Sequence, residues 1–242
     1  MPAEEELERQ IEGIASLRDP LRRALYLFVT RTGREVSRDE AAKEVGVARS
    51  TAAFHLEKLV DEGLLDTSFR RLSGRAGPGA GRPSKLYRRS AQQLQLSLPA
   101  RHYELAARLL AGALSQAIEQ GSSPLQRLAE DAAALGKSLG QRARGKSVGR
   151  SRGVRLAKVL HALREEGFEP YREGNCLYLR NCPFHVLAQE HPNLICGMNQ
   201  SLLQGLLQGL RATGFDARLS PERGRCCVAI TPDIDSVRTA AP

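Results

Sequence analysis

The chain has 242 residues, a net charge of +9 and a hydrophobic content of 41%. This length allows one large domain or two small ones, each with its own core. No apolar run approaches the roughly 20 residues that a membrane span needs, and the acidic N-terminal segment lacks the apolar region of a signal peptide. We therefore expect a cytoplasmic protein with no membrane association.

Positive charge is concentrated in two stretches. Seven Lys and Arg residues lie between Arg70 and Arg89, and eight lie between Lys137 and Lys158, with no Asp or Glu in either stretch. Clustered positive charge favours a polyanionic partner, of which nucleic acid is the first candidate. A solvated basic linker is the alternative, above all for the second stretch.

Capping and stop signals in the N-terminal third predict three short helices. Asp19 as N-cap and Pro20 at the first helical position open the first one. A capping box at 37–40 opens the second. The third runs from about 48 to 62, with apolar residues at i, i+4, i+7 and i+8. The last two helices are typical of a helix-turn-helix.

An extended segment up to Phe69 follows this helix pair. A basic stretch rich in Gly and Pro occupies 74–85, and the residues at 86–89 (Leu-Tyr-Arg-Arg) predict a return strand. Two strands around a basic loop, directly after such a helix pair, predict a wing. Residues 1–90 are therefore expected to form a winged helix-turn-helix DNA-binding domain.

The helix at 48–62 is the predicted recognition helix. If its apolar residues point inward, its outer face is free to enter the major groove. Hydroxyl and cationic side chains on that face can bond to phosphates or base edges. A helical hairpin that packs against another element is the alternative. The predicted DNA contacts are Arg49, Ser50, Thr51, Phe54, His55 and Lys58 on this helix, with Arg82 and Lys85 on the wing.

Helical patterns continue beyond the wing at 99–120 and 123–139. The first of these carries small residues that would let a partner helix approach closely. A helix at 154–166, two β-hairpins and two further helices follow. The predicted fold class is mainly α with small β elements. Its parts are the winged helix-turn-helix at 1–90, a helical dimerisation region and linker at 91–148, a small cysteine-containing α+β cofactor-sensing domain at 149–232, and a flexible tail at 233–242.

Three of the five cysteines lie where local signals suit a metal site. Cys182 and Cys196 fall where helices are predicted to begin, and a helix start stabilises a thiolate. Cys226 is expected on a strand, on the face that carries apolar residues. Cys227 then points to the opposite face, so the two are not expected to serve one site. A disulfide framework is not expected in the cytoplasm.

The cysteine spacing lacks the CxxC pairs of common zinc sites. Three separated thiolates favour an iron–sulfur cluster, with bound zinc as the alternative. Cys176, Cys227, His185 or a small exogenous molecule would supply a fourth ligand, and an open fourth position would suit a labile sensor. Each cysteine can instead be an inert buried residue. A Cys182–His185 nucleophile pair lacks an oxyanion donor and an orienting acid, so we expect no enzyme.

The segments NCPFH, HPNLICGMN and GRCCV, together with the winged helix, resemble the iron–sulfur-sensing repressors of Suf-type cluster biogenesis, in the arsenic-repressor-like superfamily. The resemblance covers roughly residues 19–230. It implies a homodimer that binds a palindromic double-stranded DNA operator and represses transcription when it holds an iron–sulfur cluster. It also implies that Cys182, Cys196 and Cys226 ligate the cluster, with [4Fe–4S] favoured over [2Fe–2S]. Cys176 and Cys227 depart from the family pattern.

We therefore expect a transcription regulator, by this resemblance a repressor, whose operator binding depends on an iron–sulfur cluster. One alternative is a winged-helix regulator that senses an organic ligand, with inert cysteines. A second alternative keeps the regulator and replaces the cluster with a structural zinc ion.

Overall fold

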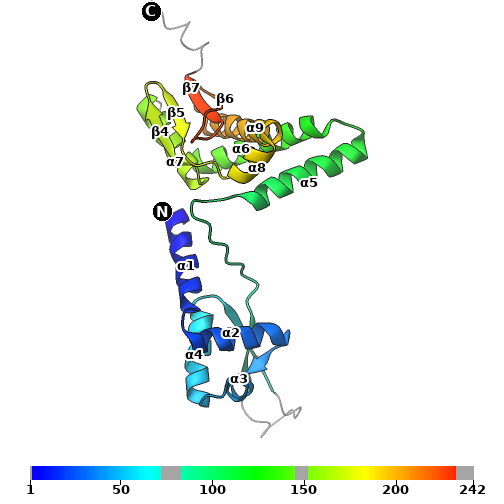
Figure 1. Ribbon diagram of the computed structural model, residues 1–242, viewed down its shortest axis with the longest axis vertical. Helices are drawn as coiled ribbons and strands as arrows, with labels where there is room; N and C mark the ends of the chain where they lie inside the picture. Colours follow the sequence, from blue (N-terminus) through cyan, green and yellow to red (C-terminus); the bar gives the residue numbers. More distant parts are fainter. Residues whose placement is uncertain (1, 72–82, 145–151, 233–242) are drawn as a thin grey trace, which may run out of the picture. The chain divides into compact units, whose positions relative to one another are not determined.

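The computed structural model describes residues 2–71, 83–144 and 152–232. The chain divides into two compact units, Met1–Leu96 and Ser97–Pro242, and each has its own hydrophobic core (Figure 1). The predicted wing tip with Arg82, the middle of the basic linker and the predicted tail lie outside the described residues.

The helices of the N-terminal unit include the three predicted ones. These are α2 (Pro20–Thr32), α3 (Arg38–Val45) and α4 (Arg49–Asp61). The expected caps are present: Asp19 accepts a hydrogen bond from a backbone N–H of α2, and the capping box opens α3. An additional helix, α1 (Pro2–Ser16), precedes them and was not predicted. The predicted helix-turn-helix is thus confirmed at the level of its helices.

A small antiparallel sheet completes this unit. Its strands are β1 (Val36–Ser37), β2 (Leu65–Arg70) and β3 (Ser84–Arg89), in the order β1-β3-β2. Tyr87 of β3 lies opposite Val36, and both side chains are buried in the core of the helices. The β2–β3 pair directly follows α4, where the sequence predicted the two strands of a wing.

The C-terminal unit combines helices with a four-stranded antiparallel sheet in the order β4-β5-β7-β6. Its helices are α5 (Tyr103–Gln120), α6 (Pro124–Arg144), α7 (Arg152–Glu165), α8 (His185–Glu190) and α9 (Pro192–Leu210). Its strands are β4 (Pro170–Glu173), β5 (Cys176–Leu179), β6 (Phe215–Leu219) and β7 (Val228–Pro232). The two predicted hairpins are present, and the β5–β7 pairing joins them into one sheet. None of the described helices combines the length and the apolar character of a membrane span.

The helices predicted as a dimerisation region are not a separate domain. Buried residues of α5 and α6 belong to the same hydrophobic cluster as those of α7, α9 and the sheet. The boundary between units lies at Leu96, not at residue 90, and none falls at 148. Helix α6 also continues to Arg144, five residues past its predicted end. Two arginines in its last turn favour this extension, because cations stabilise a helix C-terminus.

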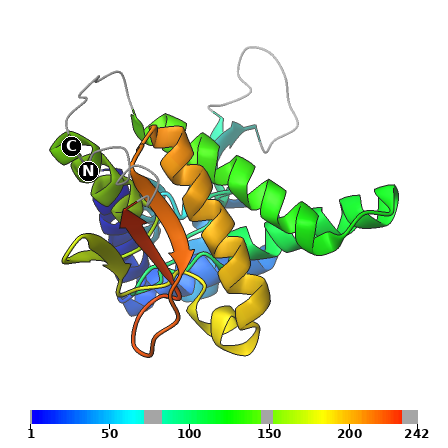
Figure 2. The ribbon, with the colours of Figure 1, turned by 90° about the horizontal axis from the view of Figure 1, so that it is seen from above.

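Helices α6 and α9 lie side by side with their backbones in contact (Figures 1 and 2). Gly136 and Gly140 of α6 face the backbone of α9, and Gly205 and Gly209 of α9 face the backbone of α6. Gly205 faces Ala133, and Gly209, one turn later, faces Lys137. The two helices therefore run parallel. A Cβ atom at any of the four glycines would meet backbone atoms of the other helix well inside van der Waals contact. The sequence interpretation missed this pair of GxxxG stripes.

We predict that Gly205→Ala destabilises the C-terminal unit by roughly 3 kcal/mol, the upper end of what overpacking a core costs, because the new methyl group meets the Ala133 carbonyl. Gly197→Ala in the same helix is the matched control. It has open space around its Cβ position and should stabilise by about 0.5–1 kcal/mol through helix propensity. Urea unfolding measures both changes. Equal effects of the two substitutions would contradict the backbone contact.

Candidate functional site

The two faces of α4 are arranged as a recognition helix requires. Three residues predicted to point inward are fully buried: Ala52, Leu56 and Leu59. The opposite face carries four exposed residues, Arg49, Ser50, Phe54 and Lys58, beside a half-buried Thr51. The predicted orientation of this helix is therefore confirmed, and the DNA contacts themselves stay a prediction.

Two of the predicted DNA contacts, His55 and Lys85, are half-buried and bind side chains of other elements. His55 is half-buried and accepts a hydrogen bond at its Nδ1 from Arg22 of α2, at 3.5 Å. Lys85 lies with its Nζ 2.5 Å from Glu57 Oε2 of α4, and Tyr87 donates a hydrogen bond of 2.7 Å to the same carboxylate. Burial by itself raises the pKa of Glu57, but the hydrogen bonds from Lys85 and Tyr87 outweigh it and lower this pKa. Lys85 thus binds β3 to α4.

Exposed side chains on α4 and β2 remain accessible to a polyanion. Arg49 Nε lies 2.5 Å from Asp39 Oδ1, and both side chains are about 60% exposed. Exposed ion pairs contribute little stability, so Arg49 can exchange this partner for a phosphate. Phe69 of β2 is 67% exposed on the wing and was not singled out in the sequence.

Four cysteines line one hollow of the C-terminal unit, with a volume of about 320 Å³. Cys182, Cys196 and Cys226 come from three separate segments, and Cys227 joins them. We call this the cysteine hollow. Its lining comprises Cys182, His185, Ala188, Gln189, Pro192, Cys196, Pro221, Glu222, Arg223, Gly224, Arg225, Cys226 and Cys227.

The structure corrects the expected helix starts at this site. Helix α8 begins at His185, whose N–H donates to the Cys182 carbonyl at 3.0 Å, so Cys182 lies in the preceding turn. Helix α9 begins at Pro192, and Cys196 is its fifth residue. Proline favours the first helical position because it has no N–H to leave unpaired. The helix therefore starts one turn earlier than predicted.

The structure also corrects the expectation for the adjacent cysteines. Strand β7 begins at Val228, so Cys226 and Cys227 precede it and do not follow strand alternation. The Cys226 N–H donates to the Leu179 carbonyl at 2.8 Å, and the Cys227 carbonyl accepts from Ser220 at 2.7 Å. Both cysteines nevertheless line the cysteine hollow.

The four sulfurs form two pairs. Cys196 and Cys227 are joined as a disulfide, which the sequence did not predict, with their Cα atoms 6.2 Å apart. Cys182 and Cys226 are free thiols that hydrogen bond to each other. The hydrogen bond from Cys226 lowers the pKa of Cys182 against the effect of burial, helped by the Phe184 N–H and by Arg101. The same hydrogen bond, together with burial, raises the pKa of Cys226. The pair therefore loses its first proton at Cys182.

A buried asparagine stands beside these sulfurs and was not noticed in the sequence. Asn199 is fully buried, and its Nδ2 donates to Cys226 Sγ at 3.4 Å. Its Oδ1 has no hydrogen-bond partner among the described residues. The sequence spacing could have indicated this position: Asn199 follows Cys196 by three residues, so both lie on the same face of the helix.

The Cys182 turn is also tied to the segment that precedes α5. Arg101 donates to Asn181 Oδ1 and, at 3.3 Å, to the Cys182 carbonyl. Asn181 donates from its Nδ2 to the Ala100 carbonyl at 3.1 Å, and the His102 N–H donates to the Pro183 carbonyl at 3.0 Å. We call this set of bonds the linker clamp. No sequence pattern pointed to it, because its two sides are about eighty residues apart.

The other predicted ligands have different places. His185 lines the cysteine hollow and is exposed, whereas Cys176 lies at the start of β5 outside that lining. Among the described residues, no three His, Cys, Asp or Glu side chains are arranged as a metal-ion site. A disulfide sulfur offers no thiolate, so two of the four sulfurs are withheld in this form. With the disulfide reduced, the donor set matches the soft thiolate ligands of iron–sulfur clusters and zinc.

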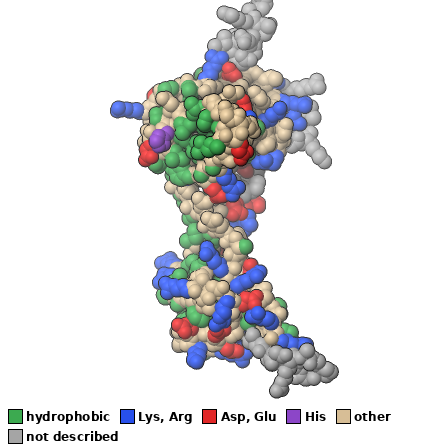
Figure 3. All heavy atoms as spheres, turned by 90° about the vertical axis from the view of Figure 1, so that its right-hand side faces the viewer, with side chains coloured by type: hydrophobic (Ala, Val, Ile, Leu, Met, Phe, Trp, Pro, Cys, Tyr) green, Lys and Arg blue, Asp and Glu red, His purple; other side chains and the backbone are tan. Residues whose placement is uncertain are grey.

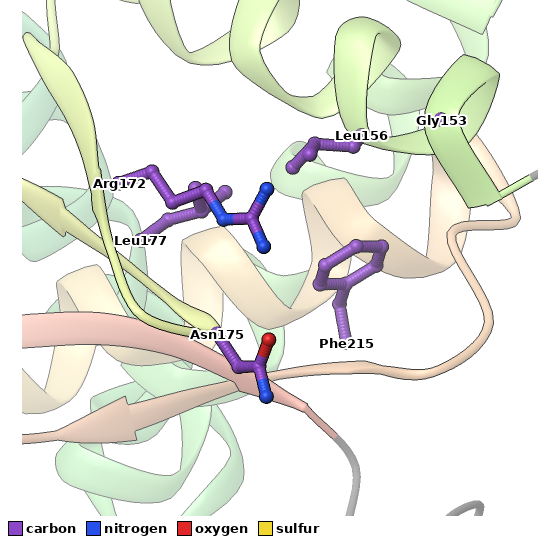
Figure 4. Close-up of a pocket in the computed structure, with 6 residues that line it drawn as sticks. All are labelled: Gly153, Leu156, Arg172, Asn175, Leu177 and Phe215. Atoms are coloured by element: carbon purple, nitrogen blue, oxygen red, sulfur yellow. The ribbon is translucent and has the colours of Figure 1, made fainter.

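A second hollow, of about 260 Å³, lies between α7 and the sheet. Figure 4 shows the Arg172 guanidinium pointing into it between Leu156 and Phe215. Arg172 also donates from Nε to the Gly174 carbonyl at 2.7 Å. This hollow combines an apolar wall with one cation, so it could accept a small organic anion.

Comparison with known proteins identifies the N-terminal segment. Residues 17–68 match a family model described as a helix-turn-helix domain. This chain carries a helix-turn-helix DNA-binding domain. The match supports a DNA-binding transcription regulator, and it covers α2, α3, α4 and the start of β2. No curated protein and no solved structure matches the chain.

We predict that the pKa of Cys182 lies below that of an ordinary free thiol, because the Cys226 thiol donates to its thiolate. In reduced, metal-free protein, alkylation of Cys182 should reach half its maximal rate at a lower pH than in an unfolded peptide. Site-resolved mass spectrometry across pH measures this rate. Cys226→Ala removes the donor and should move the Cys182 profile upward. An unchanged profile would contradict the thiol pair.

Proposed function

We propose that this protein is a transcription regulator, a repressor by its resemblance, whose operator binding is controlled by an iron–sulfur cluster at the cysteine hollow. The observation that carries the proposal is the convergence of Cys182, Cys196 and Cys226 from three segments. Sulfurs from separate segments that meet at one hollow are the arrangement that a cysteine-ligated cluster needs. The helix-turn-helix supplies the DNA-binding half of the function.

The surroundings of the hollow suit an anionic, sulfur-rich group. Cys182, Cys196 and Cys226 would hold it, and the bound cluster would supply a centre sensitive to iron supply and to oxidants. The positive charge of Arg101 acts on Cys182 and favours its thiolate form. The Asn199 amide donates to a sulfur, and hydrogen bonds to ligand sulfurs tune a cluster's reduction potential.

The linker clamp supports a route from the hollow toward the DNA-binding unit. Arg101 and Asn181 bind the segment at 100–102 to the Cys182 turn. The N-terminal unit ends only a few residues earlier, at Leu96. The position of Cys182 therefore fixes where the chain leaves the C-terminal unit. A movement of Cys182 would therefore also move the segment at 100–102, where the chain leaves the C-terminal unit.

A homodimer is part of this proposal, and an apolar face on α5 supports it. Figure 3 shows hydrophobic side chains gathered on the C-terminal unit. Leu114 and Ile118 of α5 are 52% and 75% exposed, and Leu125 at the start of α6 is 64% exposed. On α5, Leu114 and Ile118 continue a spacing of three and four that begins at the exposed Ala107 and Ala111. Such a stripe suits pairing with the same stripe of a second copy, as in coiled coils.

The second hollow favours one other candidate function. Its cation and apolar wall support a regulator that senses a small organic anion, with cysteines that play no part in control. Regulation would then persist when Cys182, Cys196 and Cys226 are all replaced by Ser, and it would be lost in Arg172→Ala.

DNA binding should be strongly salt-dependent, because phosphate contacts release counterions. For a dimer with six to ten such contacts, affinity for a duplex selected from a random pool should fall roughly 10³–10⁵-fold between 50 and 200 mM salt. Lys58→Ala should reduce the salt slope by about one per protomer. Arg164→Ala, at an exposed position of α7, is the control. Fluorescence anisotropy measures the slopes, and a slope near zero would remove the DNA-binding proposal.

Anaerobically purified protein should be brown and contain iron and acid-labile sulfide. Replacing Cys182, Cys196 or Cys226 singly by Ser should lower the iron content, because each removes a ligand, whereas Cys176→Ser should retain it. Visible absorption with iron and sulfide analysis provides the measurement. Colourless protein without iron after reconstitution counts against the cluster, and one zinc ion per chain would favour the zinc alternative.

A further inference from the structure

The two sulfur pairs of the cysteine hollow differ in chemical state. Cys182 and Cys226 are free thiols, whereas Cys196 and Cys227 are joined. Each pair takes one cysteine from the segment just before β7 and one from the α8–α9 side. All four belong to one hollow, so changing the state of one pair changes what the hollow offers to a metal.

We propose that Cys227 is a fourth sulfur ligand of this site, and that its disulfide with Cys196 is the closed form of the site, in which metal cannot be held. The inference rests on the proposed metal-binding function of the hollow and names a ligand beyond the three cysteines of that proposal. The reduced hollow offers four thiolates, which complete a tetrahedral set. The oxidised hollow offers two, and two sulfurs are too few for a stable site.

Geometry supports the assignment of Cys227. Its Cα lies 6.2 Å from that of Cys196, so the two sulfurs reach each other without movement of the backbone. Cys226 is anchored through its N–H to the Leu179 carbonyl, and the Cys227 carbonyl is anchored to Ser220. Both bonds are made by the backbone, so opening the disulfide removes neither of them.

The buried amide of Asn199 is a second, independent observation. This side chain is fully buried, donates to Cys226 Sγ, and leaves its Oδ1 without a partner among the described residues. A buried polar atom without a partner is costly in a closed core. Its presence beside the sulfurs is accounted for by a site built to receive a polar or charged group.

The Cys196–Cys227 disulfide forms by exchange with a small-molecule disulfide, which is the oxidant. The thiolate of Cys196 or Cys227 attacks one sulfur of the small disulfide, forms a mixed disulfide and releases one small thiol. The other cysteine of the pair then attacks the mixed disulfide and releases the second small thiol. In total, the two cysteines lose two protons and two electrons, and the small disulfide is reduced to two thiols.

Cobalt(II) tests the inference, because its visible bands report how many thiolates bind it. The reduced full-length protein and Cys176→Ser should each bind one ion with the spectrum of four thiolates. Cys227→Ser should bind at least about tenfold more weakly, since loss of even an outer-shell partner costs that much. Oxidised glutathione should abolish binding by the wild type, and dithiothreitol should restore it.

Peptide mapping of the oxidised wild type gives a readout that needs no variant. It should find the Cys196–Cys227 crosslink and free Cys182 and Cys226. Equal cobalt binding by Cys227→Ser, or a Cys182–Cys226 crosslink instead, overturns the inference and leaves the three-cysteine site intact. If the reduced wild type takes up neither cobalt nor iron with sulfide, the proposed function falls together with the inference.

Discussion

The backbone contact between α6 and α9 constrains the whole C-terminal unit. Four glycines, Gly136, Gly140, Gly205 and Gly209, remove the side chains that would keep the two helices apart. Helix α9 carries Cys196 and also packs on β6 and β7, the strands that flank the segment of Cys226 and Cys227. The distances within the cysteine hollow therefore depend on how closely α9 approaches its neighbours. A functional site made of sulfurs from separate segments needs such a rigid frame.

The cysteine hollow and the exit toward the DNA-binding unit share one turn of the chain. Cys182 supplies a sulfur to the hollow, while its carbonyl and the side chain of Asn181 bind Arg101. One short turn thus lines the hollow and also holds the segment that precedes α5. In the N-terminal unit, the Lys85–Glu57 pair similarly binds β3 to α4. In both units, a cationic side chain binds together two elements that are far apart in the sequence.

The four cysteines of the hollow differ in chemical state. Cys182 is favoured as a thiolate by its hydrogen bond from Cys226, and Cys226 is held as a thiol by that bond and by burial. Cys196 and Cys227 are joined as a disulfide. These differences in chemical state underlie the proposed response of the hollow to metal supply and to the redox state of its surroundings.

Local signals in the sequence determined the helix-turn-helix, because caps such as Asp19 and the apolar spacing of α4 act within a few residues and need no tertiary partner. They also determined the hairpins and singled out Cys182, Cys196 and Cys226. The sequence placed Cys227 on the opposite face of a strand from Cys226, whereas the strand begins only at Val228 and both cysteines line the hollow. The α6–α9 contact, the linker clamp and the pairing of the sulfurs were decided by tertiary structure alone. Each joins residues separated by tens of positions, and local chemistry carries no record of which distant segments will meet.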